Sequence, residues 1–120
     1  MRYLFIFLLP FLFSSCGKEG LGGEAVIKGY VKHHSAPIPN AVVYIKFGSK
    51  ESPGSNTSSY DESVTADANA FYEITGLKKG DYYLYGVGMD TAISKAVVGG
   101  IPVEIKKRKE VVQADVPVTE

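Results

Sequence analysis

The amino-acid sequence predicts an all-β fold, a seven-stranded antiparallel Greek-key sandwich that occupies residues 24–120. From Glu24 onward apolar residues recur at every second position, the period of a half-buried strand, and no segment has the spacing of an amphipathic helix. Turns rich in Gly, Pro, Asn, Asp and Ser recur about every 8–12 residues between these segments, which is typical of a sandwich. The chain has 120 residues, enough for one small domain.

The first two expected strands are Val26–Lys32 and Ala41–Phe47. Alternate residues of the first strand share one face, namely Ile27, Gly29 and Val31. The second strand is rich in β-branched and aromatic residues. The segment between them, His33–Asn40, contains two prolines and is expected to be a turn. Gly48–Glu62 offers little that could be buried, so we expect a long loop, and such loops often carry function.

Five more strands are expected, and they follow in the order Ser63–Ala66, Phe71–Ile74, Tyr82–Met89, Ile101–Ile105 and Val111–Val118. Turns separate them at Asp67–Ala70, Thr75–Asp81 and Lys106–Glu110. Alternation places Tyr83 and Tyr85 on one face of the 82–89 strand and Tyr82 on the other. Residues 90–96 have no clear pattern.

Composition excludes several classes of function. Lys and Arg number 13, as do Asp and Glu, so the formal net charge is zero, which argues against a nucleic-acid partner. The single Cys can neither close an internal disulfide nor form a Cys-based zinc site. No P-loop, dinucleotide or nucleophile–base–acid pattern is present, so we expect a non-enzyme without a cofactor.

The N-terminal segment 1–15 predicts a signal peptide. Arg2 supplies the positive charge, Tyr3–Phe13 is an apolar run of 11 residues, and the small residues Ser14 and Ser15 follow. A run of this length is too short to span a bilayer, which needs about 20 apolar residues.

The sequence LFSSCG at residues 12–17 resembles the lipobox of bacterial lipoproteins, with Phe13 departing from the usual small residue. The resemblance implies cleavage between Ser15 and Cys16 and lipidation of the Cys16 thiol. It also implies a protein held by its lipid anchor in the bacterial cell envelope, at the outer membrane. Residues 16–23 are Gly-rich and are expected to form a flexible linker to the domain of residues 24–120.

Four segments carry a second resemblance: IKGYV at 27–31, PNAVV at 39–43, TADANAFY at 65–72 and ITGLKKGDY at 74–82. Together they resemble the carboxypeptidase-regulatory-like domains, which are prealbumin-like (transthyretin-like) sandwiches. The motif suggests that Leu77 fills the core between the sheets while Gly76 and Gly80 let the backbone turn around it. Ala70 stands where the family has Gly, so we expect either that the left-handed residue of this turn is Asn69 or that the turn is strained. The family implies a non-catalytic accessory or binding role.

Two groups of polar residues have a metal-binding interpretation and a structural one. His33 and His34 are adjacent and lack a nearby third ligand, which favours a solvated turn over a metal site. The acidic residues Asp61, Glu62 and Asp67, with Asn69, are only a fragment of a Ca²⁺ loop, which favours turn chemistry. The sequence therefore predicts no metal site.

Three further features bear on recognition. The basic run Lys106–Lys109 could touch lipid headgroups, although a solubilising turn is the favoured interpretation. Tyrosines could form a glycan platform, and alternation turns about half of them outward; the candidates are Tyr72, Tyr82, Tyr83 and Tyr85. The sequence DTA at 90–92 resembles an O-glycosylation motif of exported bacterial proteins, with Thr91 as the acceptor.

We therefore expect a lipid-anchored envelope lipoprotein whose sandwich is a non-catalytic binding or structural module. Its contact loops would be Gly48–Glu62 and Asp90–Lys95, and its partner, protein or glycan, stays open. The alternative is a carbohydrate-binding accessory of a polysaccharide-uptake system. A small prealbumin-like hydrolase is less favoured, because residues 16–120 retain only His33, His34 and Arg108 of the His and Arg that such enzymes use.

Overall fold

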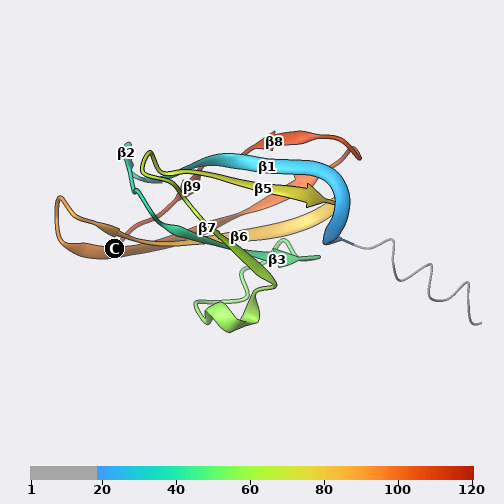
Figure 1. Cartoon of the computed structure of the whole chain (residues 1–120). Helices are drawn as coiled ribbons and strands as arrows, with labels where there is room; N and C mark the ends of the chain where they lie inside the picture. The colour runs from blue at the N-terminus through green and yellow to red at the C-terminus, as the bar shows by residue number, and fades with distance from the viewer. Residues whose placement is uncertain (1–18) are drawn as a thin grey trace, which may run out of the picture.

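The structure, a computed structural model, describes residues 19–120, in which nine β-strands form two facing sheets (Figure 1). The predicted all-β sandwich is confirmed. The only helical segment in the described range is the short 3₁₀ turn Thr57–Ser59. No helix among residues 19–120 is long and apolar enough to cross a membrane. The expected signal peptide of residues 1–15 and the lipidation site Cys16 lie outside the described residues.

The first sheet is organised around the 13-residue strand β1 (Leu21–His33). On one side β1 pairs antiparallel with β5 (Phe71–Leu77). It also pairs antiparallel with the two-residue β2 (Ala36–Pro37), and parallel with β8 (Val111–Gln113) and β9 (Val116–Pro117). The expectation of a purely antiparallel sandwich is therefore wrong for the last two strands. Alternation of apolar residues fixes which face of a strand is buried but carries no information on strand direction.

The second sheet has the order β4-β3-β6-β7 and is antiparallel throughout. Its strands are β4 (Glu62–Thr65), β3 (Val42–Phe47), β6 (Gly80–Asp90) and β7 (Lys95–Ile105). β6 and β7 pair from Asp90↔Lys95 to Gly80↔Ile105. Residues 95–100 have no clear strand pattern of their own, but they pair with β6 in this hairpin. β7 is therefore longer than the expected Ile101–Ile105.

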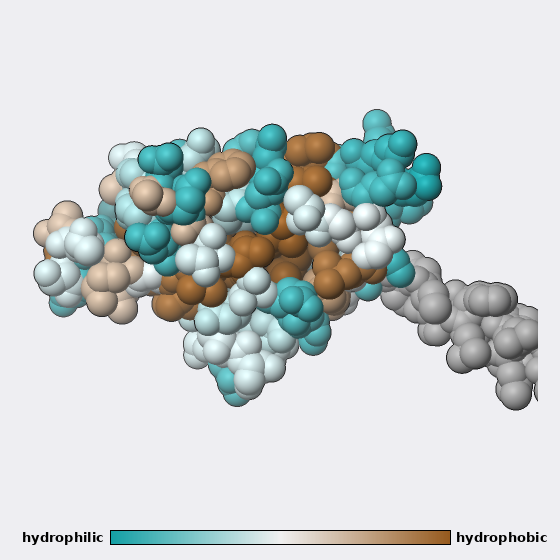
Figure 2. All heavy atoms as spheres, viewed as in Figure 1, coloured by the Kyte–Doolittle hydropathy of each residue, from teal (hydrophilic) through white to brown (hydrophobic). Residues whose placement is uncertain are grey.

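The core lies between the two sheets, and in Figure 2 hydrophobic (brown) atoms reach the surface between the upper and lower layers. Leu77 is fully buried, as the sequence predicts. Each inward face contributes aliphatic and tyrosine side chains that are at most 1 % exposed: Ile27, Val31, Tyr72 and Val116 from one sheet, and Val43, Ile45, Tyr82 and Leu84 from the other. Area removed from water is the main stabilising contribution in such a domain.

Strand boundaries differ from expectation at both ends of the domain. β1 begins at Leu21, inside the expected linker, because Leu21 pairs with Leu77 and the Gly20 carbonyl accepts the Lys78 N–H at 2.9 Å. The expected seventh strand Val111–Val118 is divided into β8 and β9. At the division the Ala114 N–H donates to the Lys28 carbonyl at 2.8 Å. This division and the two-residue β2 account for nine strands where seven were expected.

Of the two expectations for the turn before β5, the structure shows the strained one, because the left-handed residue is Ala70, with φ 67°, and not Asn69. The Asp67 carboxylate accepts the N–H groups of Asn69 at 2.8 Å and Phe71 at 3.0 Å. The Ala70 N–H donates to the Asp67 carbonyl at 3.0 Å, and Ala70 is fully buried. Hydrogen bonds on both sides thus hold an alanine in a region that L-residues disfavour.

Candidate functional site

The outward face of the second sheet is lined with aromatic residues. β3 and β6 pair so that Tyr44 lies opposite Tyr85 and Lys46 opposite Tyr83. Residues at alternate positions, such as Leu84, point into the core. Because the pairing is antiparallel, each of these cross-strand pairs lies on the same outward face.

The excursion between β3 and β4, residues 48–61, adds a further ring to this face. Tyr60 stacks on Tyr85 with ring centroids 5.6 Å apart and planes at 15°, and its centroid lies 5.9 Å from that of Tyr44. We call Tyr44, Tyr60, Tyr83 and Tyr85 the tyrosine face. In Figure 1 the excursion projects below the sheet, and in Figure 2 it appears as mostly white and teal atoms.

Polar contacts hold the excursion against β3. The Asp61 N–H donates to the Ile45 carbonyl at 2.9 Å, and the Asp61 carboxylate accepts the Phe47 N–H at 2.7 Å. Lys46 lies 3.7 Å from the same carboxylate. The Tyr60 hydroxyl donates to the Gly54 carbonyl at 2.8 Å, and burial raises its pKa. The ring of Tyr60 is therefore fixed in place and not free to swing into solvent.

A hollow of about 260 Å³ opens beside these rings. It is lined by Tyr44, Thr57, Tyr60, Asp61, Glu62 and Ser63. Aromatic surface next to hydroxyl and carboxylate oxygens can pack against the apolar face of a small polar ligand while accepting its hydrogen bonds.

The structure divides the four predicted tyrosines into two pairs, as alternation predicts. Tyr83 and Tyr85 lie on the outward face, but Tyr85 is only 8 % exposed and has the ring of Tyr60 stacked on it. The Tyr83 ring covers Gly100, where a Cβ would be 2.8 Å from Cε2 of the ring. Tyr72 and Tyr82 are buried in the core, and burial raises both pKa values. The Tyr72 hydroxyl donates to the Ala114 carbonyl, and that of Tyr82 donates to the Lys78 carbonyl at 2.6 Å.

Sequence reasoning missed Tyr44 and Tyr60. The alternation of Val43 and Ile45 with Tyr44 could have placed Tyr44 outward. No local pattern in the excursion marks Tyr60, because its position depends on the contact with Tyr85.

The expectation that His33 and His34 lie in a solvated turn is wrong for His33. His33 is 5 % exposed, and its Nδ1 lies 2.7 Å from Asp90 Oδ2. Its Nε2 lies 2.7 Å from a carboxylate oxygen of Glu120, without hydrogen-bond geometry. The hydrogen bond to Asp90 raises the pKa of His33, and the same bond lowers the pKa of Asp90. The exposed His34 packs its ring 4.4 Å from that of His33.

The remaining predicted residues are dispersed over the surface. Thr91 is exposed in the turn between β6 and β7, where the Asp90 carboxylate accepts the Ala92 N–H at 3.0 Å. Among residues 19–120 no three His, Cys, Asp or Glu side chains are grouped to hold a metal ion. In the Lys106–Lys109 turn the Glu110 carboxylate accepts the N–H of Lys106 at 2.7 Å.

Comparison with known proteins finds a likeness of fold only. No family model matches the sequence, and no curated protein matches it. Among solved structures, the fold is similar to that of a proposed carbohydrate-binding protein from Pseudomonas aeruginosa. The two chains are 16 % identical, with a TM-score of 0.54, and the alignment covers 88 % of this chain and 95 % of the other. At this identity the likeness establishes a shared architecture and nothing about a ligand.

Proposed function

We propose that this protein is a lipid-anchored, non-catalytic binding module of the bacterial cell envelope that holds a carbohydrate on its tyrosine face. The observation that carries the ligand class is the hollow in which Tyr44 and Tyr60 stand beside the carboxylates of Asp61 and Glu62. A sugar ring has an apolar face of C–H groups and a rim of hydroxyl donors, which match aromatic faces and carboxylate acceptors respectively.

The sequence similarity to lipoboxes supports the anchor. A short apolar leader ends at Ser15, followed by the only Cys of the chain, Cys16. Lipid chains contribute about 0.8 kcal/mol per buried CH₂, so two or more chains on one Cys give stable attachment. The carboxypeptidase-regulatory-like resemblance of residues 27–82 agrees with an accessory role on such an anchor.

The surroundings of His33 support the non-catalytic part of the proposal. A general base needs one ring nitrogen directed at a nucleophile or water. In His33 both nitrogens face carboxylates, those of Asp90 and Glu120, at 2.7 Å. This arrangement joins β1, the β6–β7 hairpin and the C-terminal segment, a structural role for His33 that favours the non-catalytic proposal over the small-hydrolase alternative.

A glycan array with the purified protein tests the ligand class, followed by affinity measurements on the strongest glycan. Tyr60→Ala and Tyr44→Ala should each weaken binding by about tenfold, the loss typical of an aromatic contact residue. Tyr30→Ala is the matched control, because Tyr30 is a 38 % exposed tyrosine on the other sheet. Binding only to long polymers would favour the accessory of a polysaccharide-uptake system. An array without any bound glycan contradicts the carbohydrate proposal and favours a protein partner.

The anchor is tested separately by mass spectrometry of the protein purified from cell membranes. We expect a chain that begins at Cys16 with acyl groups attached, and a Cys16→Ala variant that no longer fractionates with membranes. An unmodified Cys16 with the leader still attached contradicts the anchor and the envelope localisation together.

A further inference from the structure

Two basic turns meet at the end of the sandwich where the described chain begins. Lys78 and Lys79 lie between β5 and β6, and Lys106–Lys109 lies between β7 and β8. The Lys78 N–H donates to the Gly20 carbonyl at 2.9 Å, and Gly80 pairs with Ile105 at the start of the second turn. We call these six cationic residues the basic end: Lys78, Lys79, Lys106, Lys107, Arg108 and Lys109.

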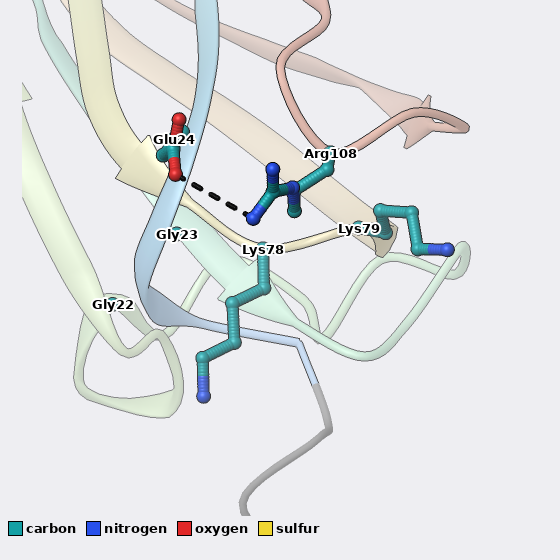
Figure 3. A pocket seen from close by; sticks show the side chains of 6 residues that line it. All are labelled: Gly22, Gly23, Glu24, Lys78, Lys79 and Arg108. Carbon is teal, nitrogen blue, oxygen red and sulfur yellow. Dashed lines mark ion pairs between the residues drawn. The ribbon is translucent and has the colours of Figure 1, made fainter.

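A pocket of about 230 Å³ lies at this end, shown in Figure 3. Its lining consists of Gly22, Gly23, Glu24, Lys78, Lys79 and Arg108. In Figure 3 the Arg108 side chain points across the pocket towards Glu24, and the chain leaves the domain just below Lys78. Arg108 and Glu24 are separated by 3.7 Å, and Lys109 lies 3.6 Å from the same carboxylate.

The positive charge of the basic end is only partly balanced by neighbouring carboxylates. The Glu110 carboxylate is occupied by the backbone N–H groups of Lys106 and Lys107. Lys79, Lys106 and Lys107 are exposed and form no ion pair with any residue from 19 to 120.

The other acids of this region have partners of their own. Asp81 and Glu104 both lie within 4.0 Å of Lys50, and the Glu19 carboxylate accepts the Asp81 N–H at 3.3 Å. The two turns therefore present a cationic surface beside the pocket.

The position of this surface relative to the proposed anchor follows from chain length. Two residues lie between Cys16 and Glu19, the first described residue, and the three residue steps from one to the other span at most about 10 Å. That distance equals about one Debye length at 0.1 M salt, so charges at the basic end would act on a membrane surface without full screening. Polybasic segments next to a membrane attract anionic headgroups in this way.

We propose that the basic end binds anionic phosphate headgroups of the membrane that holds the anchor, an inference that rests on the proposed lipidation of Cys16. The anchor supplies attachment and the basic end supplies orientation. The domain then stands on its Lys78 and Lys106–Lys109 turns, with the hairpin tip at Thr91 directed away from the membrane and the tyrosine face to the side.

The test uses the protein purified with its anchor and reconstituted into vesicles of phosphatidylcholine, with or without phosphatidylglycerol. Flotation in about 1 M NaCl, where screening is nearly complete, reports the anchor alone. A water-soluble amine reagent with peptide mass spectrometry then reports orientation. We expect Lys79, Lys106 and Lys107 to react at least about twofold more slowly in the anionic vesicles, and Lys95, at the opposite end of β7, to react equally in both.

The outcomes separate the two proposals. Protein that floats in high salt but shows equal rates at Lys79 and Lys107 in both vesicles keeps its anchor and overturns the orientation. Protein that does not float in high salt lacks the anchor, which contradicts the proposed lipidation of Cys16 and with it the orientation proposal. If inorganic phosphate protects the same lysines equally in neutral vesicles, the site takes free phosphate and the headgroup proposal is wrong.

Charge variants give a second measurement of the same proposal. Lys79→Gln with Lys107→Gln should abolish the protection of Lys106. Lys28→Gln with Lys95→Gln changes the net charge equally but lies outside the basic end, so it should leave the protection unchanged. If Lys106 loses its protection from the amine reagent in both double variants, the effect depends on net charge and the proposal of a binding site at the basic end is wrong.

Discussion

Gly29→Ala tests how closely the C-terminal strands pack on β1. Gly29 is buried in the middle of β1, and a Cβ built there would lie 2.1 Å from the Ala114 carbonyl oxygen. The backbone between β8 and β9 must therefore move away from β1 by more than an ångström to admit a methyl group. Three hydrogen bonds hold that backbone in place. They are Ala114 N–H to the Lys28 carbonyl at 2.8 Å, Tyr30 N–H to the Asp115 carboxylate at 3.0 Å, and the Tyr72 hydroxyl to the Ala114 carbonyl.

Loss of these three bonds should lower the free energy of unfolding by about 3 kcal/mol, at about 1 kcal/mol for each bond. With an m-value of about 1.5 kcal/mol per molar urea, the midpoint of urea unfolding followed by circular dichroism should fall by about 2 M. Gly86→Ala is the matched control. Its Cβ would meet only valine methyl groups, the nearest at 3.0 Å, so the loss should be smaller. A Gly29→Ala chain within about 0.5 kcal/mol of the natural one would refute the reasoning.

Three further predictions concern stability. The hydrogen bond to Asp90 raises the pKa of His33 above its ordinary 6.5, so the charged ring stabilises the fold below that pH and its contribution is lost as pH rises through the folded value. Urea midpoints should therefore fall as the pH rises above about 6.5, and a His33→Gln chain that shows the same fall would contradict this. Ala70→Val should cost at least about 2 kcal/mol, because a β-branched residue resists φ 67°, whereas Ala70→Gly should stay within about 1 kcal/mol; equal melting temperatures for the two would argue against strain. Tyr72→Phe should cost about 1–3 kcal/mol in urea unfolding, since it leaves the Ala114 carbonyl without its hydroxyl donor, and an unchanged midpoint would show that the bond contributes nothing.

The sequence was sufficient for the features that depend on neighbouring residues. The alternation in residues 82–89 predicted that Tyr83 and Tyr85 share one face of the strand and that Tyr82 lies on the other, and the structure confirms this division. Strand pleating has a period of two, so the pattern separates the two faces, but it does not tell which of them is turned to the core. Burial of Leu77 was implied by the resemblance of residues 74–82 to the carboxypeptidase-regulatory-like motif, and the structure shows Leu77 fully buried.

Features that depend on distant residues could not be predicted. His33 is separated from Asp90 by 57 positions, and nothing near His33 indicates that a carboxylate will meet it. The site gains Tyr60 only because the excursion folds back over Tyr44 and Tyr85. The direction of β8 and β9 depends on the crossing from one sheet to the other after β7, which periodicity does not encode.

The central position of β1 has a consequence for the order in which the chain can fold. The first strand is completed on one side by β5 and on the other by β8 and β9, which are made last. When only the first half of this chain has been synthesised, β1 is present but β5, β8 and β9, the strands that flank it, are not yet made. Contacts between segments so far apart in sequence form slowly. Under the proposed export by a signal peptide, this delay would keep the chain unfolded while it crosses the membrane, since the first sheet cannot be completed before β8 and β9 arrive.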